Sequence, residues 1–351
     1  MKVFFAALCF LVDLNLVEAA PKKNLIIDTD LFSDVDDAGA LLLAATSADV
    51  NLLAVNVNYP STYSAEAASA ILAHYGLSDV PIGIRRPLGN ATFFDGWSYE
   101  LGEYASKVAF HWSGGSLPWG RAADALDPVA LYRKALAGAE DGSVTITSLG
   151  FLDSLSGLLN STADIYSGLA GRELVARKVA ELVVMGGAYP SGYEFNFWGS
   201  NASLTAHVVN TWEGRVVYAG FELGEYVMSG ARLVAEGPKT DPVRMAYIYY
   251  KYYAPRESWD PLAVLYAVNG LGSLFELGNE YGYNHVEVNG SNRWFWDEKV
   301  QNQFFLKLKV DQEVAATELH WLFLQGAWSA VNQLAPSASL KNQARIDRKY
   351  L

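Results

Sequence analysis

Near its N-terminus the chain reads Leu25-Ile26-Ile27-Asp28-Thr29-Asp30-Leu31-Phe32-Ser33-Asp34-Val35-Asp36-Asp37-Ala38. Its first residues are apolar in succession, and such unbroken apolar runs are typical of strands covered on both faces. The pattern over Asp36–Thr46 then predicts a helix directly after the acidic turn. A buried strand that leads into a helix is the repeating unit of a parallel, helix-covered sheet.

The same alternation of apolar runs and longer amphipathic stretches continues along the chain. Strands are predicted at Asn24–Thr29, Val50–Asn56, Val80–Ile84, Val144–Leu149, Leu182–Met185 and Arg215–Ala219. Helices are predicted, among others, at Asp36–Thr46, Ser64–Tyr75 and Pro128–Ala137. Because parallel strands need helical crossovers, we expect an α/β fold, a doubly wound, mostly parallel sheet with helices on both faces. Ligands of such sheets bind beyond the carboxyl ends of the strands.

The composition is that of a folded protein. Of 351 residues, 51% are apolar and 18% are charged, which excludes a disordered chain. The net charge of −12 argues against nucleic acid and anionic membrane as partners and leaves cation binding open. No homo-oligomer interface is recognisable in the sequence, so the number of copies in an assembly stays open.

Residues 1–20 are typical of a signal peptide. Lys2 precedes the apolar run Val3–Val12, and Glu18-Ala19-Ala20 offers small residues for cleavage before Pro21. The apolar run is too short to span a membrane. We therefore expect a secreted protein in which residues 21–351 form one α/β domain with a C-terminal helical extension.

Removal of the leader would also remove Cys9, the single cysteine of the chain. The mature protein would then have no disulfide and no cysteine ligand for a metal. Four glycosylation sequons support passage through a secretory pathway, and they begin at Asn90, Asn160, Asn201 and Asn289.

The acidic turn predicts a metal site. Five carboxylates fall within ten residues, at Asp28, Asp30, Asp34, Asp36 and Asp37, and unpaired charges at this density would repel one another. A hard divalent cation with oxygen ligands, Ca²⁺ or Mg²⁺, resolves the repulsion. The alternative, a solvated turn with a helix cap, needs only one or two carboxylates.

Two other acidic motifs fit poorly. An EF-hand loop that starts at Asp34 would need glutamate at position 45, which is alanine, and one that starts at Asp28 would have Phe32 at its fifth position. The Asp-x-Asp motif of haloacid-dehalogenase-type phosphatases is matched only by Asp28-Thr29-Asp30.

Four blocks of sequence occur in an order that points to one family. They are the acidic stretch, Thr145–Leu152, Val184–Gly187 with Glu194-Phe195-Asn196, and Trp259–Val264. The first resembles the N-terminal signature of the inosine–uridine-preferring nucleoside hydrolase family in its longer form, Asp-Thr-Asp-x-Gly-x-Asp-x-Asp-Asp-Ala, with Phe32 in place of the glycine. The others resemble the family's Gly-Pro-Leu-Thr-Asn turn, its Met-Gly-Gly…Glu-Phe-Asn block and its (His/Trp)-Asp-Pro-Leu-Ala segment.

This resemblance implies Ca²⁺-dependent hydrolysis of the N-glycosidic bond of ribonucleosides to a free base and ribose. It implies calcium ligands at the carboxylates of Asp30, Asp37 and Asp260 and at the main-chain carbonyl of Leu149. Asp30 would also be the general base on a water at the calcium ion. The ribose would be held by Asp36, Glu194 and Asn196.

The chemistry agrees with these residue types. Cleavage of a bond from nitrogen to an anomeric carbon develops oxocarbenium character, which nearby carboxylates stabilise. One carboxylate can accept the proton of the attacking water, and direct attack predicts inversion at the anomeric carbon.

The departing base needs assistance of its own. Trp259 stands where one branch of the family has a histidine that acts as a general acid. A tryptophan at this position resembles that of the purine-preferring branch, in which aromatic rings stack on the base and assist its departure. Core packing is the alternative for this indole. A second stacking ring is predicted among the tryptophans at 97, 112, 119 and 198.

Other residues are weaker candidates for the base side. The helical pattern around Tyr249 predicts that it could share a lid with Tyr252 or Tyr253, with core packing as the alternative. His111 lies in a predicted glycine-rich loop and is a candidate mobile acid, whereas His74 and His207 are predicted to be structural.

Several departures from the family pattern keep alternatives open. The asparagine expected after the second strand aligns near Ser61, and no asparagine is evident in Ala188–Gly192. The Thr-Asn pair of the turn after Leu149 is Asp153-Ser154. The alternatives are a nucleoside- or sugar-binding protein that no longer turns over, and a hydrolase of another ribosyl or glycosyl substrate.

Overall fold

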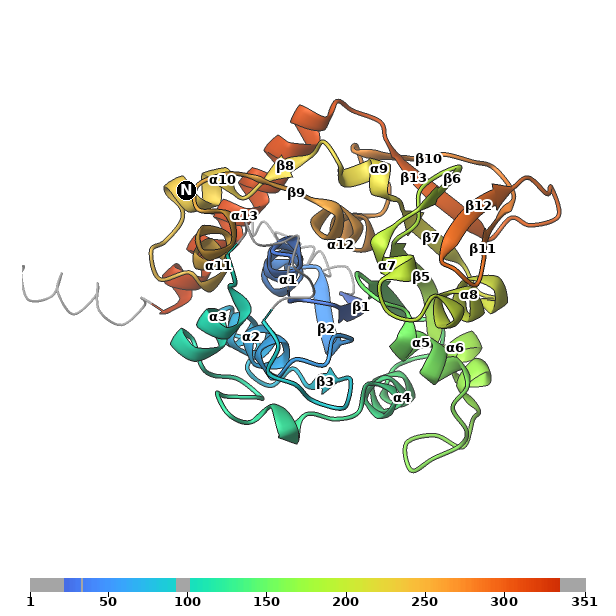
Figure 1. Cartoon of the computed structure of the whole chain (residues 1–351), viewed down its shortest axis with the longest axis horizontal. Coiled ribbons are helices and arrows are strands. Elements are labelled where there is room, and N and C mark those ends of the chain that lie inside the picture. The colour runs from blue at the N-terminus through green and yellow to red at the C-terminus, as the bar shows by residue number, and fades with distance from the viewer. Residues whose placement is uncertain (1–21, 33, 93–101, 335–351) are drawn as a thin grey trace, which may run out of the picture.

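A central eight-stranded sheet organises the protein, whose computed structural model describes residues 22–32, 34–92 and 102–334 (Figure 1). The strand order is β10-β13-β7-β5-β4-β1-β2-β3, and every neighbouring pair is parallel except β10 with β13. The strands of this sheet are β1 (Lys23–Thr29), β2 (Val50–Val57), β3 (Ile82–Ile84), β4 (Val144–Ser148), β5 (Val179–Met185), β7 (Val216–Ala219), β10 (Phe275–Leu277) and β13 (Gln303–Leu308).

Helices cover both faces of this sheet, with a separate apolar core on each side. Leu25 and Ile27 of β1 point into one core and Ile26 into the other, as the alternation of a pleated strand requires. Helices on the first side are α1 (Asp36–Thr46), α2 (Thr62–His74), α3 (Ala105–His111), α10 (Ala231–Glu236), α11 (Pro242–Lys251), α12 (Trp259–Asn269) and α13 (Gln312–Leu334). Helices on the second side are α4 (Pro128–Gly138), α5 (Asp153–Leu159), α6 (Gly171–Lys178) and α8 (Ala202–Thr211).

The predicted fold class is confirmed, and local signals place several elements closely. Helix α1 spans Asp36–Thr46 as predicted, and its two acidic residues lie in the first turn, where the helix dipole favours negative charge. Helix α4 begins at Pro128 after Asp127, whose side chain accepts hydrogen bonds from two backbone N–H groups. The third strand is shorter than predicted, because it begins at Ile82 rather than Val80.

Two small antiparallel sheets were not predicted. One contains β11 (Tyr283–Val286), β12 (Ser291–Phe295) and β6 (Ser191–Tyr193), and the other pairs β8 (Met228–Ser229) with β9 (Arg256–Glu257). Both bring segments that are far apart in the sequence to the rim of the large sheet. Two short helices, α7 (Phe195–Trp198) and α9 (Phe221–Gly224), complete the rim.

The strand order reverses at β1, which pairs with β2 on one side and with β4 on the other. Such a reversal separates the loops that leave the two strands and opens a crevice at their carboxyl ends. Asp30 follows β1 and Leu149 follows β4, so both predicted site residues lie at this crevice. Among the described residues, no helix has the length and apolar character needed to cross a membrane.

Candidate active site

A pocket of about 380 Å³ lies at this reversal point. All eight residues that the family resemblance assigns to the metal, the ribose or the base line it, namely Asp30, Asp36, Asp37, Leu149, Glu194, Asn196, Trp259 and Asp260. These residues come from the ends of β1 and β4 and from helices α1, α7 and α12. The pocket therefore collects residues from most of the length of the chain.

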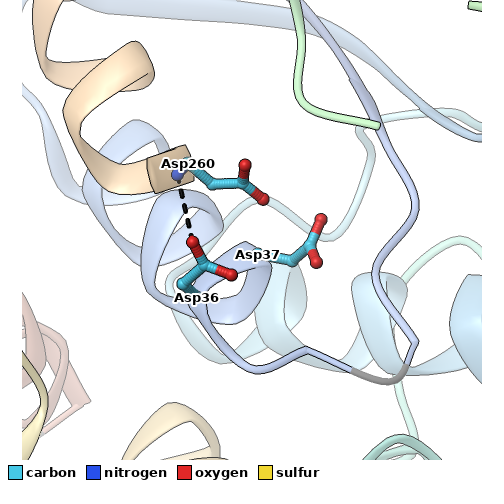
Figure 2. A group of neighbouring side chains, drawn as sticks. All are labelled: Asp36, Asp37 and Asp260. Atoms are coloured by element: carbon cyan, nitrogen blue, oxygen red, sulfur yellow. Dashed lines mark hydrogen bonds between the residues drawn. The ribbon is translucent and has the colours of Figure 1, made fainter. Parts of the chain in front are cut away.

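Three carboxylates that line the pocket meet one another (Figure 2). Asp36, Asp37 and Asp260 are buried, and each offers an oxygen within 4.8 Å of the other two. Asp36 and Asp37 open helix α1, while Asp260 lies in the first turn of α12. Two helix N-termini thus face one site, and both favour negative charge there.

Hydrogen bonds fix two of these carboxylates. One oxygen of Asp36, Oδ2, accepts from the backbone N–H groups of Trp259 and Asp260, at 3.0 and 3.1 Å. The hydroxyl of Thr29 donates to Asp37 Oδ1. Asp36 therefore caps α12.

The other predicted metal ligands flank this group. A Cβ atom added to Gly150 would come within 2.4 Å of Asp30 Oδ1, so the Asp30 carboxylate lies directly against the turn after β4. The carbonyl of Leu149 accepts a hydrogen bond from Asn196 Nδ2 at 2.9 Å and has a second lone pair. Asp30 is not one of the three carboxylates that meet most closely, and Asp36, predicted as a sugar ligand, takes that place.

Burial governs the charge of this cluster. Loss of water raises the pKa values of Asp36, Asp37 and Asp260 well above the usual range, and repulsion from the neighbouring carboxylates raises them further. Burial likewise raises the pKa of Asp30 to about 8. A bound cation would reverse both effects, so these buried oxygen donors fit a hard metal ion.

Glu194 and Asn196 line the pocket from the start of α7. The two carboxylate oxygens of Glu194 accept from the backbone N–H groups of Asn196 and Gly187, at 2.9 and 3.0 Å. Burial raises the pKa of Glu194 to about 7 even though these N–H groups favour its ionised form. Both side chains line the same pocket as the carboxylate cluster.

Two stacked aromatic pairs also line the pocket. Trp259 stacks on Phe221 with ring centres 5.4 Å apart, and its indole N–H donates to the Phe221 carbonyl. Trp198 stacks on Tyr193 at 5.5 Å. Three of these rings keep roughly two fifths or more of their surface exposed, which is unusual for large apolar residues that converge on one pocket.

Of the tryptophans predicted as a second stacking ring, Trp198 lines the pocket. Trp112 instead donates its N–H to the Thr240 carbonyl, and Trp119 stacks on Tyr63, both away from the site. The structure does not bring these two to the site because both lie near the α2–α3 edge of the fold. Trp97 lies outside the described residues, as does the predicted leader at 1–20.

The predicted tyrosine lid is wrong in its residues. Tyr252 and Tyr253 are about 70% exposed, and neither they nor Tyr249 line the pocket, whereas Tyr250 does. The helix ends at Lys251, and Tyr252 has a positive φ of 57°, so the pattern of helical neighbours does not extend past that point. The loop position predicted for His111 is also wrong, because His111 is the last residue of helix α3. It is absent from the pocket lining, and its ring contacts Phe110 and Trp112.

The structure explains one of the departures from the family pattern, the asparagine expected after the second strand. The residue after β2 is Asn58, which donates to Asp28 at 2.8 Å and accepts from the backbone N–H of Phe151. Ser61 instead bonds to the Ala91 carbonyl and does not line the pocket. An asparagine therefore does follow the second strand, but it supports the turn after β4 from behind.

Sequence analysis missed one ion pair in the pocket. Arg256 on β9 pairs with Asp34 through two nitrogens, and Arg256 Nε lies 2.9 Å from Asp34 Oδ1. This pairing lowers the pKa of Asp34 despite its burial. Arg256 precedes Trp259 by three residues, but it is 222 residues from Asp34 in the sequence. No local sequence pattern indicates a contact over that separation.

Comparison with known proteins agrees with this geometry. The profile of a family described as inosine-uridine preferring nucleoside hydrolase matches residues 25–316. A search of curated proteins found no match.

Similar solved structures share the fold at low identity. A plant nucleoside hydrolase, PpNRh1, is 18% identical with a TM-score of 0.66, over 87% of this chain and 99% of that one. An inosine-guanosine nucleoside hydrolase is 20% identical with a TM-score of 0.61, over 86% and 98%. A purine-preferring ribonucleoside hydrolase from Gardnerella vaginalis is 16% identical with a TM-score of 0.63, over 87% and 99%.

Proposed function

The chain belongs to the inosine-uridine preferring nucleoside hydrolase family, whose members are metal-dependent enzymes, and is a nucleoside hydrolase. We propose that its activity depends on Ca²⁺ and that it favours purine nucleosides. The observation that carries this proposal is the convergence of Asp36, Asp37 and Asp260 beside two stacked aromatic pairs in one pocket. The carboxylates suit a metal and a ribose, and the rings suit a flat base.

In this proposal, the ion is held by the carboxylates of Asp30, Asp37 and Asp260 and by the carbonyl of Leu149. All are oxygen donors from a buried, negatively charged site, which favours Ca²⁺ over softer metals. When bound, the ion lowers the pKa of a water molecule and orients the ribose diol.

The residues of the chain supply the remaining chemistry. Asp36, Glu194 and Asn196 bind the ribose hydroxyls, and the rigid bonds to their side chains limit the cost of ordering them. The carboxylates stabilise the positive charge that develops on the ribosyl group. Asp30 accepts the proton of the attacking water, which enters from the face opposite the base and inverts the anomeric centre.

The preference for purines rests on the aromatic lining. A purine offers two fused rings to Trp259 and to the Tyr193–Trp198 pair, whereas a pyrimidine offers one. Stacking of a base on an aromatic side chain contributes ~1–3 kcal/mol, so the larger ring gains more from the same surface.

Substrate incubations with metal control test this proposal. Protein stripped with a chelator is incubated with inosine, guanosine, adenosine and uridine, before and after addition of Ca²⁺ or Mg²⁺, and ribose is measured. We expect ribose release only with metal, faster with Ca²⁺, and faster from the three purine nucleosides. Equal rates with the chelator would overturn the metal proposal, and faster release from uridine would overturn the purine preference.

Calcium-dependent nucleoside binding without any ribose release would instead identify a binding protein. Release from other ribosides alone would identify a different substrate. Both outcomes would overturn the proposed substrate.

We also propose that the protein is secreted after removal of residues 1–20. Support comes from the leader sequence and from the asparagines of all four sequons, which are exposed. Sequencing of the N-terminus of protein from the culture medium, with and without glycosidase treatment, tests this. Material that remains in the cells and starts at Met1 would overturn it.

A further inference from the structure

The pocket has one positively charged side chain among its described lining residues, and that is Arg256. The described lining also contains six carboxylic acids and no histidine. The reaction splits a neutral nucleoside into a positively charged sugar fragment and a negatively charged base. A single guanidinium in such a pocket can therefore interact with the negative charge of the base.

Arg256 lies on the side of the pocket where the base is proposed to bind. Its guanidinium carbon is 5.2 Å from the centre of the Trp259 ring and 5.7 Å from that of Tyr250. Planar guanidinium groups stack on aromatic faces at such distances. A base that binds beside Trp259 therefore also comes beside Arg256.

The guanidinium is held firmly and keeps capacity for a ligand. Its Nε and Nη2 donate to Asp34, and its Nη1 donates to Glu257 Oε2 at 2.8 Å. Arginine has five N–H groups, and among the described residues no acceptor is recorded for the other two. Asp34 and Glu257 balance the charge of Arg256, so its contribution is directional hydrogen bonding rather than a surplus of positive charge.

We propose that Arg256 is a catalytic residue that donates hydrogen bonds to the departing base, with Asp34 as the positioning residue that aims it. This inference rests on the proposed function and supplies the leaving-group assistance that no histidine of the pocket provides. A departing base anion, like the oxyanion of an acyl-transfer reaction, carries negative charge that develops in the transition state. Preorganised hydrogen-bond donors stabilise such charge as it forms.

The step balances as follows. The bond from the anomeric carbon to the base nitrogen breaks, and its electron pair stays on the base. The water oxygen bonds to the anomeric carbon, Asp30 takes the water proton, and solvent protonates the base. Arg256 keeps its proton throughout, because the ion pair with Asp34 holds its pKa above the usual range.

Comparison of two leaving groups tests the proposal. Inosine releases a hypoxanthine anion, which is a more basic leaving group than the resonance-stabilised p-nitrophenolate that p-nitrophenyl β-D-ribofuranoside releases. Loss of one preorganised donor costs ~10²–10³-fold in kcat. We expect Arg256→Gln to lose that much kcat with inosine and to remain within ~5-fold of wild type with the phenolate substrate.

Three variants separate this role from a structural one. Arg232→Gln, which breaks an exposed pair with Glu236, is the matched control and should leave both rates unchanged. The double variant Asp34→Asn/Arg256→Gln removes both charges, so no unpaired Asp34 is left to cause misfolding. It should show the same pattern as Arg256→Gln, a large loss of kcat with inosine and a small one with the phenolate substrate. In Arg256→Ala, added guanidinium at millimolar concentration should raise the rate with inosine and not with the phenolate substrate.

The outcomes distinguish the two proposals. Equal losses of kcat with both substrates, or a loss confined to KM, would overturn the role of Arg256 and leave nucleoside hydrolysis intact. A wild-type protein that releases ribose from neither substrate in the presence of Ca²⁺ would overturn the proposed function itself.

Discussion

The side chain of Asp36, at the start of helix α1, accepts a hydrogen bond from the backbone N–H of Asp260, 224 residues later. A bond of this kind ties the two helix N-termini together and sets the spacing of the carboxylates between them. The geometry of the proposed metal site therefore depends on the packing of α1 against α12.

Asp260→Asn should remove the metal without unfolding the protein. The amide keeps the shape of the side chain but loses a charge that Ca²⁺ needs, and we expect affinity to fall by at least ~100-fold. Calorimetric titration of chelator-stripped protein measures this. Asp127→Asn, the same change at the N-terminus of α4 and away from the pocket, should bind Ca²⁺ like wild type. Unchanged affinity in Asp260→Asn would contradict the ligand assignment.

Asp30→Asn should separate binding from turnover. The variant cannot accept a proton from water, so kcat should fall ~10²–10⁴-fold. Asp30 is also a proposed calcium ligand, so Ca²⁺ is added at a concentration that saturates the weakened metal site. Nucleoside binding, measured by equilibrium dialysis under these conditions, should then persist because the sugar and base contacts remain. A kcat close to that of wild type would show that another group is the base.

Trp259→Ala should affect purine substrates more than uridine. The loss of stacking costs ~1–3 kcal/mol and falls mainly on the larger base. The ratio of kcat/KM for inosine and uridine measures it. Trp119→Ala, at an exposed tryptophan outside the pocket, is the control and should leave that ratio unchanged. Equal losses for both substrates would argue against stacking.

Gly150→Ala should lower activity more than stability. The new methyl group would lie 2.4 Å from Asp30 Oδ1, so the carboxylate must move. We expect kcat to fall at least ~10-fold, since small misplacements of catalytic groups cost up to ~100-fold. Gly138→Ala is the matched control, because its added methyl group would meet nothing within 4 Å. Equal activity in the two variants would refute the steric argument.

Glu194 should make the metal-free protein less stable as pH rises. Burial raises its pKa from 4.5 to about 7, so the native state binds the proton more tightly than the unfolded chain does. The stabilisation is complete below pH 4.5 and is lost as pH rises to about 7. Urea unfolding from pH 4.5 to 7 should show wild type losing stability relative to Glu194→Gln. A difference that is constant with pH would contradict the shift.

Much of the sheet and of the acidic site was predictable because the signals are local. The unbroken apolar run before Asp28 and the acidic first turn of α1 each depend on neighbours in the sequence. The family blocks supplied Asp260, the distant residue that is a proposed metal ligand. Residue patterns therefore located the carboxyl end of β1 and the residues around it.

The rest of the site depends on contacts between distant segments. Arg256 reaches Asp34 because β9 pairs with β8, a two-residue pairing that has no periodicity to detect. Tyr193 faces Trp198 because β6 pairs with β12, whose residues follow almost a hundred positions later. Such pairings are tertiary, and propensity alone does not encode them.

The joining of α1 to α12 also bears on biosynthesis. A ribosome completes the first carboxylates early, but Asp260 emerges only after three quarters of the chain has been made. A nascent chain or a truncated product that stops short of α12 lacks Asp260, so the proposed metal site would be incomplete in it. The proposed activity towards nucleosides would thus begin only after α12 has been made.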